Sequence, residues 1–351
     1  MSKEVQAWAD EAMFRAQSID RKAGPRVFLL SANPDPLGSI AAAAKAYKGE
    51  FVSSLAEITD DERRYYLTEV QKSVLAMPLE SVHFHFRITG VTRGFTHQMV
   101  RQRTAAYSQE STRFAVKEEV PVGLPPSIQN IPSLDERIEE LKKRMPPMTT
   151  DDELYRLIRD GRSKEEQWRD VWDATVAGIE DAYNLMVNSG MPAEDARGIL
   201  PTNLLTQINY ITDLRGLKEH AGLRLCTQAQ FEWRQVWAQI VGAIREFGQH
   251  NLYMVCDADG VESVESSEWQ FNALADLFRP ICYYRGSCQF QADFDRKCSI
   301  RERVSSFAEH GIPSNEWDVE HEVDAGTGDY RTKTILPIFP AEWLLDASAA
   351  R

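Results

Sequence analysis

The sequence predicts a helix-rich α/β fold of the α+β kind, with a small central sheet. Two short segments have the apolar run or the alternation of strands, and several longer segments have the spacing of amphipathic helices. The chain has 351 residues, of which 43% are hydrophobic and 26% charged, as is ordinary for a globular protein with a sizeable core. We expect a single domain over residues 1–351, with a surface insertion at 133–162 and a C-terminal extension at 250–351.

The first expected elements are a strand and two helices. Residues 26–31 form a short apolar run, and the turn signals Asn-Pro-Asp-Pro follow it at 33–36. An alanine-rich helix is expected over 39–47 and a charged helix over 60–76.

A second strand is expected at residues 81–88, because the side chains alternate there. Phe84 and Phe86 fall on one face and His83 and His85 on the other. We interpret the two histidines as a pair at the edge of the core rather than as metal ligands.

The middle of the chain is expected to change from a helix to loops. A helix is expected over 96–106 and an irregular polar segment over 107–113. Prolines mark a loop at 118–132, and the highly charged residues 133–162 are typical of a solvated surface insertion.

Three long helical patterns follow. Ser163 and Glu166 have the spacing of a capping box, and Gly190 ends the first pattern. The other two patterns cover 202–220 and 227–247. Tryptophans at helical spacing are expected in the core or at a subunit interface: Trp168, Trp172, Trp233 and Trp237.

Charge and composition exclude several classes of function. The net charge of -13 argues against a protein that coats polymeric nucleic acid, although a few local arginines suffice for a single nucleotide. The N-terminus lacks the apolar core of a signal peptide, and no run approaches the roughly 18–20 apolar residues that span a bilayer. We therefore expect a cytoplasmic protein without a membrane partner.

The five cysteines fit reduced thiols in a cytoplasm. Cys282, Cys288 and Cys298 are close in sequence, but their spacing contains no CxxC pair and no clear fourth ligand. We expect partly buried thiols and no metal site.

Two arginine-containing segments carry the chemistry. In residues 95–114, Gln98 and Arg101 share one helix face, and the hydroxyls and amides that follow could hold a phosphate and a sugar. A solvated helix end would have the same composition. In residues 196–234, Arg215 is expected in mid-helix, where it could equally snorkel from a core helix.

Together these segments resemble the flavin-dependent thymidylate synthases. The signature of that family is Arg-His-Arg, seven residues and a serine, and Arg101, Arg103 and Ser111 match it, while Gln102 replaces the histidine. The similarity extends over 78–100 and resumes over 196–234, where the order of the motif residues is kept. Residues 26–47 resemble the first strand and helix of the family.

The resemblance implies a fold, a reaction and a set of ligands. In that family FAD is reduced by NADPH, and a one-carbon unit passes from methylenetetrahydrofolate to C5 of dUMP, which gives dTMP. Arg224 would act at the uracil edge, where a fixed cation stabilises negative charge. The nucleotide would be bound by Gln98, Arg101, Gln109, Ser111, Thr112, Arg113, Arg197 and Arg224.

The flavin side is implied in the same way. It would be lined by His83, Arg101, Gln102, Arg103, Asp213, Arg215 and Glu219. Family active sites are shared between the subunits of a homotetramer, so we expect this chain to form one.

Four positions depart from the family pattern. Gln102 and Ser81 replace histidines, and Asp213 and Glu219 replace asparagines that face the flavin. Ionised carboxylates accept hydrogen bonds but donate none, although Arg215 could pair with Glu219 four residues along a helix. Two alternatives therefore stay open: hydroxymethylation of a pyrimidine deoxynucleotide, dUMP rather than dCMP, and a non-catalytic nucleotide-binding protein.

Overall fold

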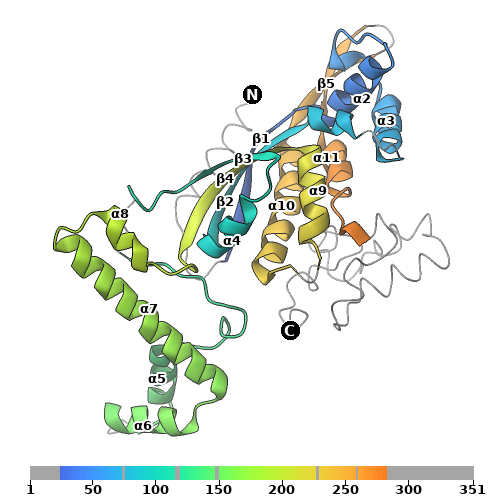
Figure 1. The fold of residues 1–351 in the computed structure, drawn as a ribbon. Coiled ribbons are helices and arrows are strands. Elements are labelled where there is room, and N and C mark those ends of the chain that lie inside the picture. Colours follow the sequence, from blue (N-terminus) through green and yellow to red (C-terminus); the bar gives the residue numbers. More distant parts are fainter. Residues whose placement is uncertain are drawn as a thin grey trace. The chain divides into compact units, whose positions relative to one another are not determined.

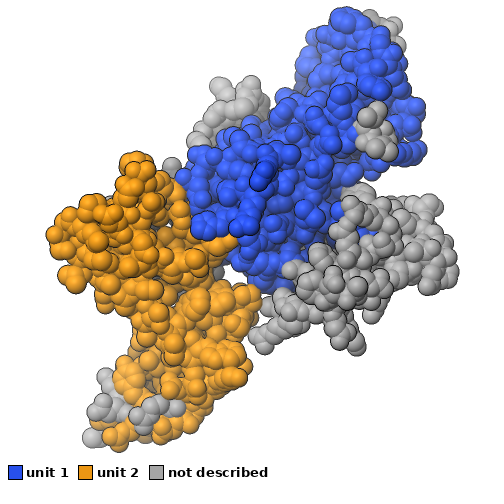
Figure 2. Space-filling model, in the orientation of Figure 1, with its two compact units in different colours: residues 1–91, 95–109, 207–351 blue, residues 92–94, 110–206 orange. Residues whose placement is uncertain are grey.

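The computed structural model describes residues 24–72, 76–114, 119–146, 150–226, 229–257 and 260–282. The chain divides into two compact units, which Figure 2 shows in different colours. Unit 1 contains residues 1–91, 95–109 and 207–351, and unit 2 contains residues 92–94 and 110–206.

A four-stranded sheet, most of whose residues belong to unit 1, has the strand order β1-β2-β4-β3 (Figure 1). β1 pairs antiparallel with β2, and β3 pairs antiparallel with β4. The strands are β1 (Arg26–Ala32), β2 (His83–Thr92), β3 (Ala105–Gln109) and β4 (Leu205–Asp213). The small sheet that the sequence predicts is therefore present.

The turn after β1 is fixed by Asp35. Its carboxylate accepts a hydrogen bond of 2.8 Å from the backbone N–H of Gly38 and so caps α2 (Pro36–Tyr47). The same carboxylate lies 2.6 Å from Nη2 of Arg63 in α3 (Asp60–Lys72), and both side chains are buried. One side chain thus joins two helices. Removal of either partner would leave an unpaired buried charge, so the contact between the start of α2 and α3 depends on both side chains.

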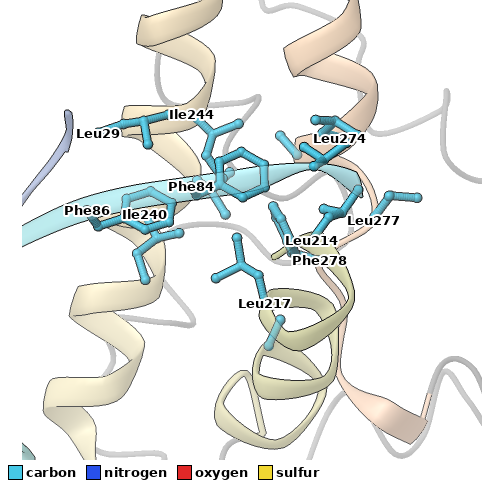
Figure 3. Close-up of a cluster of buried hydrophobic side chains, with 14 of the residues drawn as sticks. Leu29, Phe84, Phe86, Leu214, Leu217, Ile240, Ile244, Leu274, Leu277 and Phe278 are labelled. Carbon is cyan, nitrogen blue, oxygen red and sulfur yellow. The ribbon is translucent and has the colours of Figure 1, made fainter. Parts of the chain in front are cut away.

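Three helices cover the sheet of unit 1. α9 (Leu214–Arg224), α10 (Phe231–His250) and α11 (Glu268–Ala275) lie beside one another in Figure 1. Figure 3 shows their apolar side chains around β2, with Phe84 and Phe86 of that strand at the centre of the cluster. The helical side chains labelled there are Leu214, Leu217, Ile240, Ile244 and Leu274. This cluster is the main core of the chain.

β5 (Leu252–Cys256) and β6 (Glu262–Ser266) form an antiparallel hairpin that contacts the start of α3. The ring of Tyr253 lies 4.8 Å from the guanidinium carbon of Arg63, and its hydroxyl donates to Asp60 at 3.0 Å. In addition, Gln270 of α11 accepts a 2.9 Å hydrogen bond from the backbone N–H of Leu37, at the start of α2. The C-terminal part of the described chain therefore supports the turn after β1.

Unit 2 is mostly helical. Its helices are α5 (Leu134–Lys142), α6 (Asp151–Gly161), α7 (Lys164–Asn188), α8 (Ala193–Ala196) and the short η3 (Arg197–Ile199). α5, α6 and α7 each begin with a capping box, and the box of Ser163 and Glu166 confirms the sequence prediction. The expected insertion at 133–162 forms α5 and α6, and Arg137 of α5 pairs with Asp170 of α7.

Two of the helix predictions made from the sequence are wrong. The helix expected at 96–106 is α4 (Arg93–Met99), which ends early because Ala105–Gln109 form β3. The helix expected at 202–220 is instead β4 followed by α9, so Arg215 lies in the first turn of α9 and not in mid-helix. The reason is long-range pairing: β3 and β4 satisfy each other's backbone groups, and this outweighs local helical spacing.

The prediction that the tryptophans lie in the core or at a subunit interface is confirmed for α10, whereas on α7 Trp168 does not lie in a core. Trp233 and Trp237 of α10 are fully buried in the core of unit 1. Trp168 of α7 is 42% exposed and the neighbouring Val171 68% exposed, because the long helix has little of unit 2 to pack against. A subunit interface on α7 stays a prediction.

Two further expectations concern membranes and thiols. Within the described ranges, no helix combines the length and the apolar character needed to cross a bilayer. Cys282 is half-buried against the core of unit 1, whereas Cys288 and Cys298 lie outside the described residues.

Candidate active site

In unit 1, the end of α4 and the start of α10 are joined by Gln98 and Trp233. The indole Nε1–H of Trp233 donates to Oε1 of Gln98 at 3.0 Å, and Nε2 of Gln98 donates to Oε1 of Gln230 at 2.8 Å. Arg224, the last residue of α9, places its guanidinium carbon 4.6 Å from the ring centre of Trp233. Two side chains predicted to bind the nucleotide, Gln98 and Arg224, thus contact the same buried tryptophan.

Arg224 stands at the edge of an aromatic cluster. It is half-buried, burial lowers its pKa, and its Nε has no hydrogen-bond partner among the described residues. One turn earlier on α9, burial and the charge of Arg224 lower the pKa of His220 to about 3. Nδ1 of His220 lies 3.2 Å from the hydroxyl of Tyr210. Because His220 stays neutral, Arg224 is the cation at this position.

The segment between α4 and β3 is held by Tyr107. Its hydroxyl lies 2.9 Å from the carbonyl oxygen of Met99 and 3.1 Å from that of Gln102, and its ring stacks on Tyr210 at 5.5 Å. Burial raises the pKa of Tyr107, so the hydroxyl stays protonated and donates. Gln109, at the end of β3, donates to Oγ1 of Thr96 at 2.9 Å. These contacts fix the loop that carries Arg101, Gln102 and Arg103.

The predicted flavin residues at the start of α9 are joined to the start of β2. The backbone N–H of Leu214 donates to the carbonyl of Val82 at 2.8 Å, next to the exposed His83. Arg215 reaches Glu80 of η2 (Met77–Ser81), with 2.5 Å between Nη1 and Oε1. It also binds Glu219, with 3.2 Å between Nε and Oε1.

The pair of Arg215 and Glu219 confirms the sequence expectation that this arginine could neutralise the neighbouring carboxylate. Asp213 has a different role: its carboxylate accepts a 2.7 Å hydrogen bond from the backbone N–H of Gly216 and caps α9. Both acidic departures from the family pattern are thus already engaged within the protein.

The loop of Arg101 to Thr104 lies against this same first turn of α9. A methyl group added at Gly216 would come within 3.0 Å of Oγ1 of Thr104, so the small residue allows the close approach. Gln102 donates to the same Oγ1 at 2.8 Å. Arg101 and Arg103 are exposed and form no side-chain hydrogen bond or ion pair among the described residues. Two such guanidinium groups suit a phosphate-bearing cofactor.

In unit 2, the remaining predicted nucleotide residues gather near Glu194 of α8. Arg113 binds this carboxylate with both Nε and Nη2, at 2.9 and 3.0 Å. Nε of Arg197 donates to the backbone carbonyl of Glu194 at 3.1 Å. Oγ of Ser111 accepts from the backbone N–H of Arg113 at 3.3 Å, and Thr112 is buried. Arg113 and Arg197 therefore share one acidic residue as their neighbour.

A third arginine of this cluster was not expected from the sequence. Burial lowers the pKa of Arg93, Glu110 opposes that shift, and the charge of Arg197 adds to it. Glu110 in turn accepts from Oγ1 of Thr206 at 3.2 Å. Arg93 belongs to the segment 78–100, but no local pattern there distinguishes it from a surface arginine.

The structure therefore brings the predicted site residues together in three groups. Gln98 and Arg224 meet on Trp233, the flavin residues meet around the first turn of α9, and Arg113 and Arg197 meet near Glu194. Sequence reasoning missed Trp233, Gln230, Glu80 and Glu194, because each acts on a residue far away along the chain. Glu80, Gln230 and Trp233 do lie in the segments 78–100 and 196–234 that resemble the family, but nothing local in those segments indicates their contacts.

Comparison with known proteins gives a consistent result. The family model described as thymidylate synthase complementing protein matches residues 28–247. The flavin-dependent thymidylate synthase of Pyrococcus furiosus is 34% identical over 213 residues, which cover 60% of this chain and 75% of that protein. The enzyme of the same name from Geobacter sulfurreducens is 28% identical over 222 residues, covering 63% and 82%.

The match of the family model extends over more than half of the chain, and it includes all the residues of the three groups. These two relatives are matched over three quarters or more of their own length. This chain therefore belongs to the thymidylate synthase complementing protein family, the family of the flavin-dependent thymidylate synthase enzymes.

Proposed function

We propose that this enzyme transfers a one-carbon unit from methylenetetrahydrofolate to C5 of dUMP and forms dTMP, with FAD as its flavin and NADPH as the reductant. The observation that supports it best is Arg224, a half-buried cation that is held on the ring of Trp233 beside Gln98. A fixed cation in a partly desolvated position is suited to the N3–O2 edge of uracil, where negative charge develops as C5 becomes nucleophilic.

The residues proposed to bind the nucleotide are those that the resemblance implies. Gln98, Arg101, Gln109 and Arg224 are proposed as ligands, with Arg224 as the catalytic residue. Ser111, Thr112, Arg113 and Arg197 are proposed to supply the hydroxyl, backbone and guanidinium donors that a phosphate and a sugar require. Ser111 is proposed as a ligand and not as a nucleophile, because its hydroxyl accepts from the backbone N–H of Arg113 and, in the described part of the chain, no base hydrogen-bonds to it.

The flavin is proposed to lie at the first turn of α9. Arg101 and Arg103 are available for its diphosphate, and His83, Gln102, Asp213, Arg215 and Glu219 line the same edge of unit 1. When bound, reduced flavin supplies the hydride that completes the methyl group. The protein groups orient it, and the pairing of Arg215 with two carboxylates limits the repulsion that those charges would otherwise exert.

The test is release of the C5 hydrogen. Incubation with dUMP labelled by tritium at C5 is expected to release label into water only when methylenetetrahydrofolate, FAD and NADPH are all present. Omission of each component in turn is the control. Binding of dUMP by a colourless protein that releases no label would contradict the proposal and would favour a non-catalytic nucleotide-binding protein.

A second candidate function is hydroxymethylation of dUMP. It is favoured by the three carboxylates of Glu80, Asp213 and Glu219 near the proposed flavin, against the single guanidinium of Arg215 that pairs with two of them. Such negative charge disfavours an anionic reduced flavin, and water could then attack the methylene group in place of hydride. The two outcomes differ in the mass of the product.

We also propose that the chain acts as a homotetramer with active sites shared between subunits. Light scattering during gel filtration is expected to give the mass of four chains. Active enzyme that elutes only as a monomer would contradict this assembly.

A further inference from the structure

The side chains around Gln98 form a short relay whose hydrogen-bond direction is fixed at both ends. At one end stands the indole N–H of Trp233, which can only donate, and it donates to Oε1 of Gln98. At the other end stands the carboxylate of Glu232, which accepts from Nε2 of Gln230 at 3.4 Å. Between them Gln98 donates to Gln230.

This direction decides which end of the Gln98 amide is available to a ligand. The amide of a glutamine side chain can ordinarily flip, which exchanges its oxygen and nitrogen, because the two are similar in size. Here a flip would place two donors, the Trp233 N–H and the Gln98 amide NH₂, against each other. Gln98 therefore keeps its oxygen toward Trp233 and retains a second N–H that can be offered to a ligand.

Trp233 also supports the other nucleotide residue of unit 1. Its ring lies 4.6 Å from the guanidinium carbon of Arg224, within the range of a cation–π contact. The tryptophan itself is fully buried, with Phe95 at 4.2 Å and His220 at 4.9 Å between ring centres. It cannot move without disturbing the core, so both contacts are rigid.

We propose that Trp233 is a positioning residue, which fixes the Gln98 amide as a donor toward the nucleotide and supports the guanidinium of Arg224. Both groups then face the ligand as donors. They suit acceptor atoms such as carbonyl or phosphate oxygens and disfavour an exocyclic amine. This inference rests on the proposed function, because it assigns Gln98 and Arg224 to the nucleotide.

The test compares two tryptophans of the same helix. Trp233→Phe keeps a ring beneath Arg224 and removes the N–H donor together with part of the buried ring volume. Trp237→Phe is the matched control, because Trp237 is equally buried on α10 and its Nε1 has no hydrogen-bond partner among the described residues. Thermal unfolding of both variants measures the structural cost that they share.

Equilibrium dialysis is expected to show that Trp233→Phe weakens dUMP binding about three- to tenfold, the usual effect of one neutral hydrogen bond. Trp237→Phe should change it less than about twofold. In a Gln98→Ala background, Trp233→Phe should lose its effect, since it acts through that amide. Equal binding by the two phenylalanine variants, or the same loss without Gln98, would overturn the proposal.

Failure of the proposed function would look different. It would appear as absence of label release or as another product while dUMP is still bound, and the same dialysis would then still apply; if the wild-type chain bound only another pyrimidine nucleotide, the proposed substrate would be wrong. The same variants measured with that nucleotide would still decide whether Trp233 positions Gln98.

Discussion

Nε of Arg215 lies 3.2 Å from Oε1 of Glu219, one turn further along α9, while Nη1 of the same guanidinium lies 2.5 Å from Glu80. The two carboxylates raise the pKa of Arg215 and hold its side chain on the protein. The arginine thus neutralises acids of its own chain at the edge where we propose the flavin. The single positive charge of Arg215 cannot neutralise the three negative charges of Glu80, Glu219 and Asp213.

Removal of one of these charges should therefore strengthen flavin binding. We expect Glu219→Gln to bind FAD about two- to fivefold more tightly, a modest effect because the pair is exposed and screened by solvent. Titration of the apoprotein followed by flavin fluorescence measures it. The control is Glu69→Gln, which removes an exposed acid of α3 that is paired with Lys72. Weaker FAD binding by Glu219→Gln alone would show that this carboxylate aids the cofactor.

Arg224 should affect turnover much more than stability. Arg224→Ala removes the proposed cation from the uracil edge, and we expect kcat to fall by a factor of about 100 to 1000. The melting temperature should change little, because Arg224→Ala loses the cation–π contact with Trp233, worth about 0.5–1 kcal/mol at an exposed site, while Nε of Arg224 has no hydrogen-bond partner among the described residues. The neighbouring variant Leu223→Ala, which truncates an exposed side chain, is the control. Near-normal turnover of Arg224→Ala would exclude the catalytic role.

His220 should make the protein less stable in acid. Its pKa is lowered from 6.5 to about 3 in the folded state, so between these values the unfolded chain binds more protons than the folded one. The contribution of His220 is complete above about pH 6.5 and decreases as the pH falls. Between pH 6.5 and pH 5, the free energy of unfolding should decrease by about 2 kcal/mol because of His220.

Urea unfolding at these two pH values tests this dependence. His220→Gln retains a polar partner for the hydroxyl of Tyr210 but does not titrate. We expect the stability of this variant to decrease less than that of the wild type over the same interval. Equal decreases would show that His220 is protonated in the folded state or that other groups dominate.

Glu194 should compete with the nucleotide for Arg113. The two side chains form a bidentate pair, and both are about half exposed. Glu194→Gln would release the guanidinium, so we expect dUMP to bind about two- to fivefold more tightly in calorimetry. Asp195→Asn removes an adjacent charge without touching Arg113 and should have a smaller effect. Unchanged affinity in Glu194→Gln would mean that Arg113 does not bind the phosphate.

Elements with strong local signals could be predicted from the sequence. The turn at 33–36 and the Ser163–Glu166 box place α2 and α7 correctly, and the alternation around Phe84 and Phe86 identifies β2. The sequence instead predicts a helix where β4 forms. Its residues do alternate, with Ile208, Tyr210 and Thr212 buried, but they are also compatible with helical spacing until β3 pairs with them.

The candidate site was predictable in its membership but not in its contacts. The Arg101–Gln102–Arg103 and Ser111 motif identifies the family and most of the nucleotide residues. It gives no indication of Trp233, because the hydrogen bond from that indole to Gln98 spans 135 residues. The same holds for Arg215 and Glu80, which are 135 residues apart. Such contacts follow from the packing of α9 and α10 on the sheet.

The most direct test is the mass of the nucleotide product. The purified protein is incubated with dUMP, methylenetetrahydrofolate, FAD and NADPH, and the nucleotides are analysed by mass spectrometry. We expect the mass of dTMP, and none of it when NADPH is omitted. The mass of 5-hydroxymethyl-dUMP in its place, or unchanged dUMP in the complete mixture, would contradict the proposed methyl transfer.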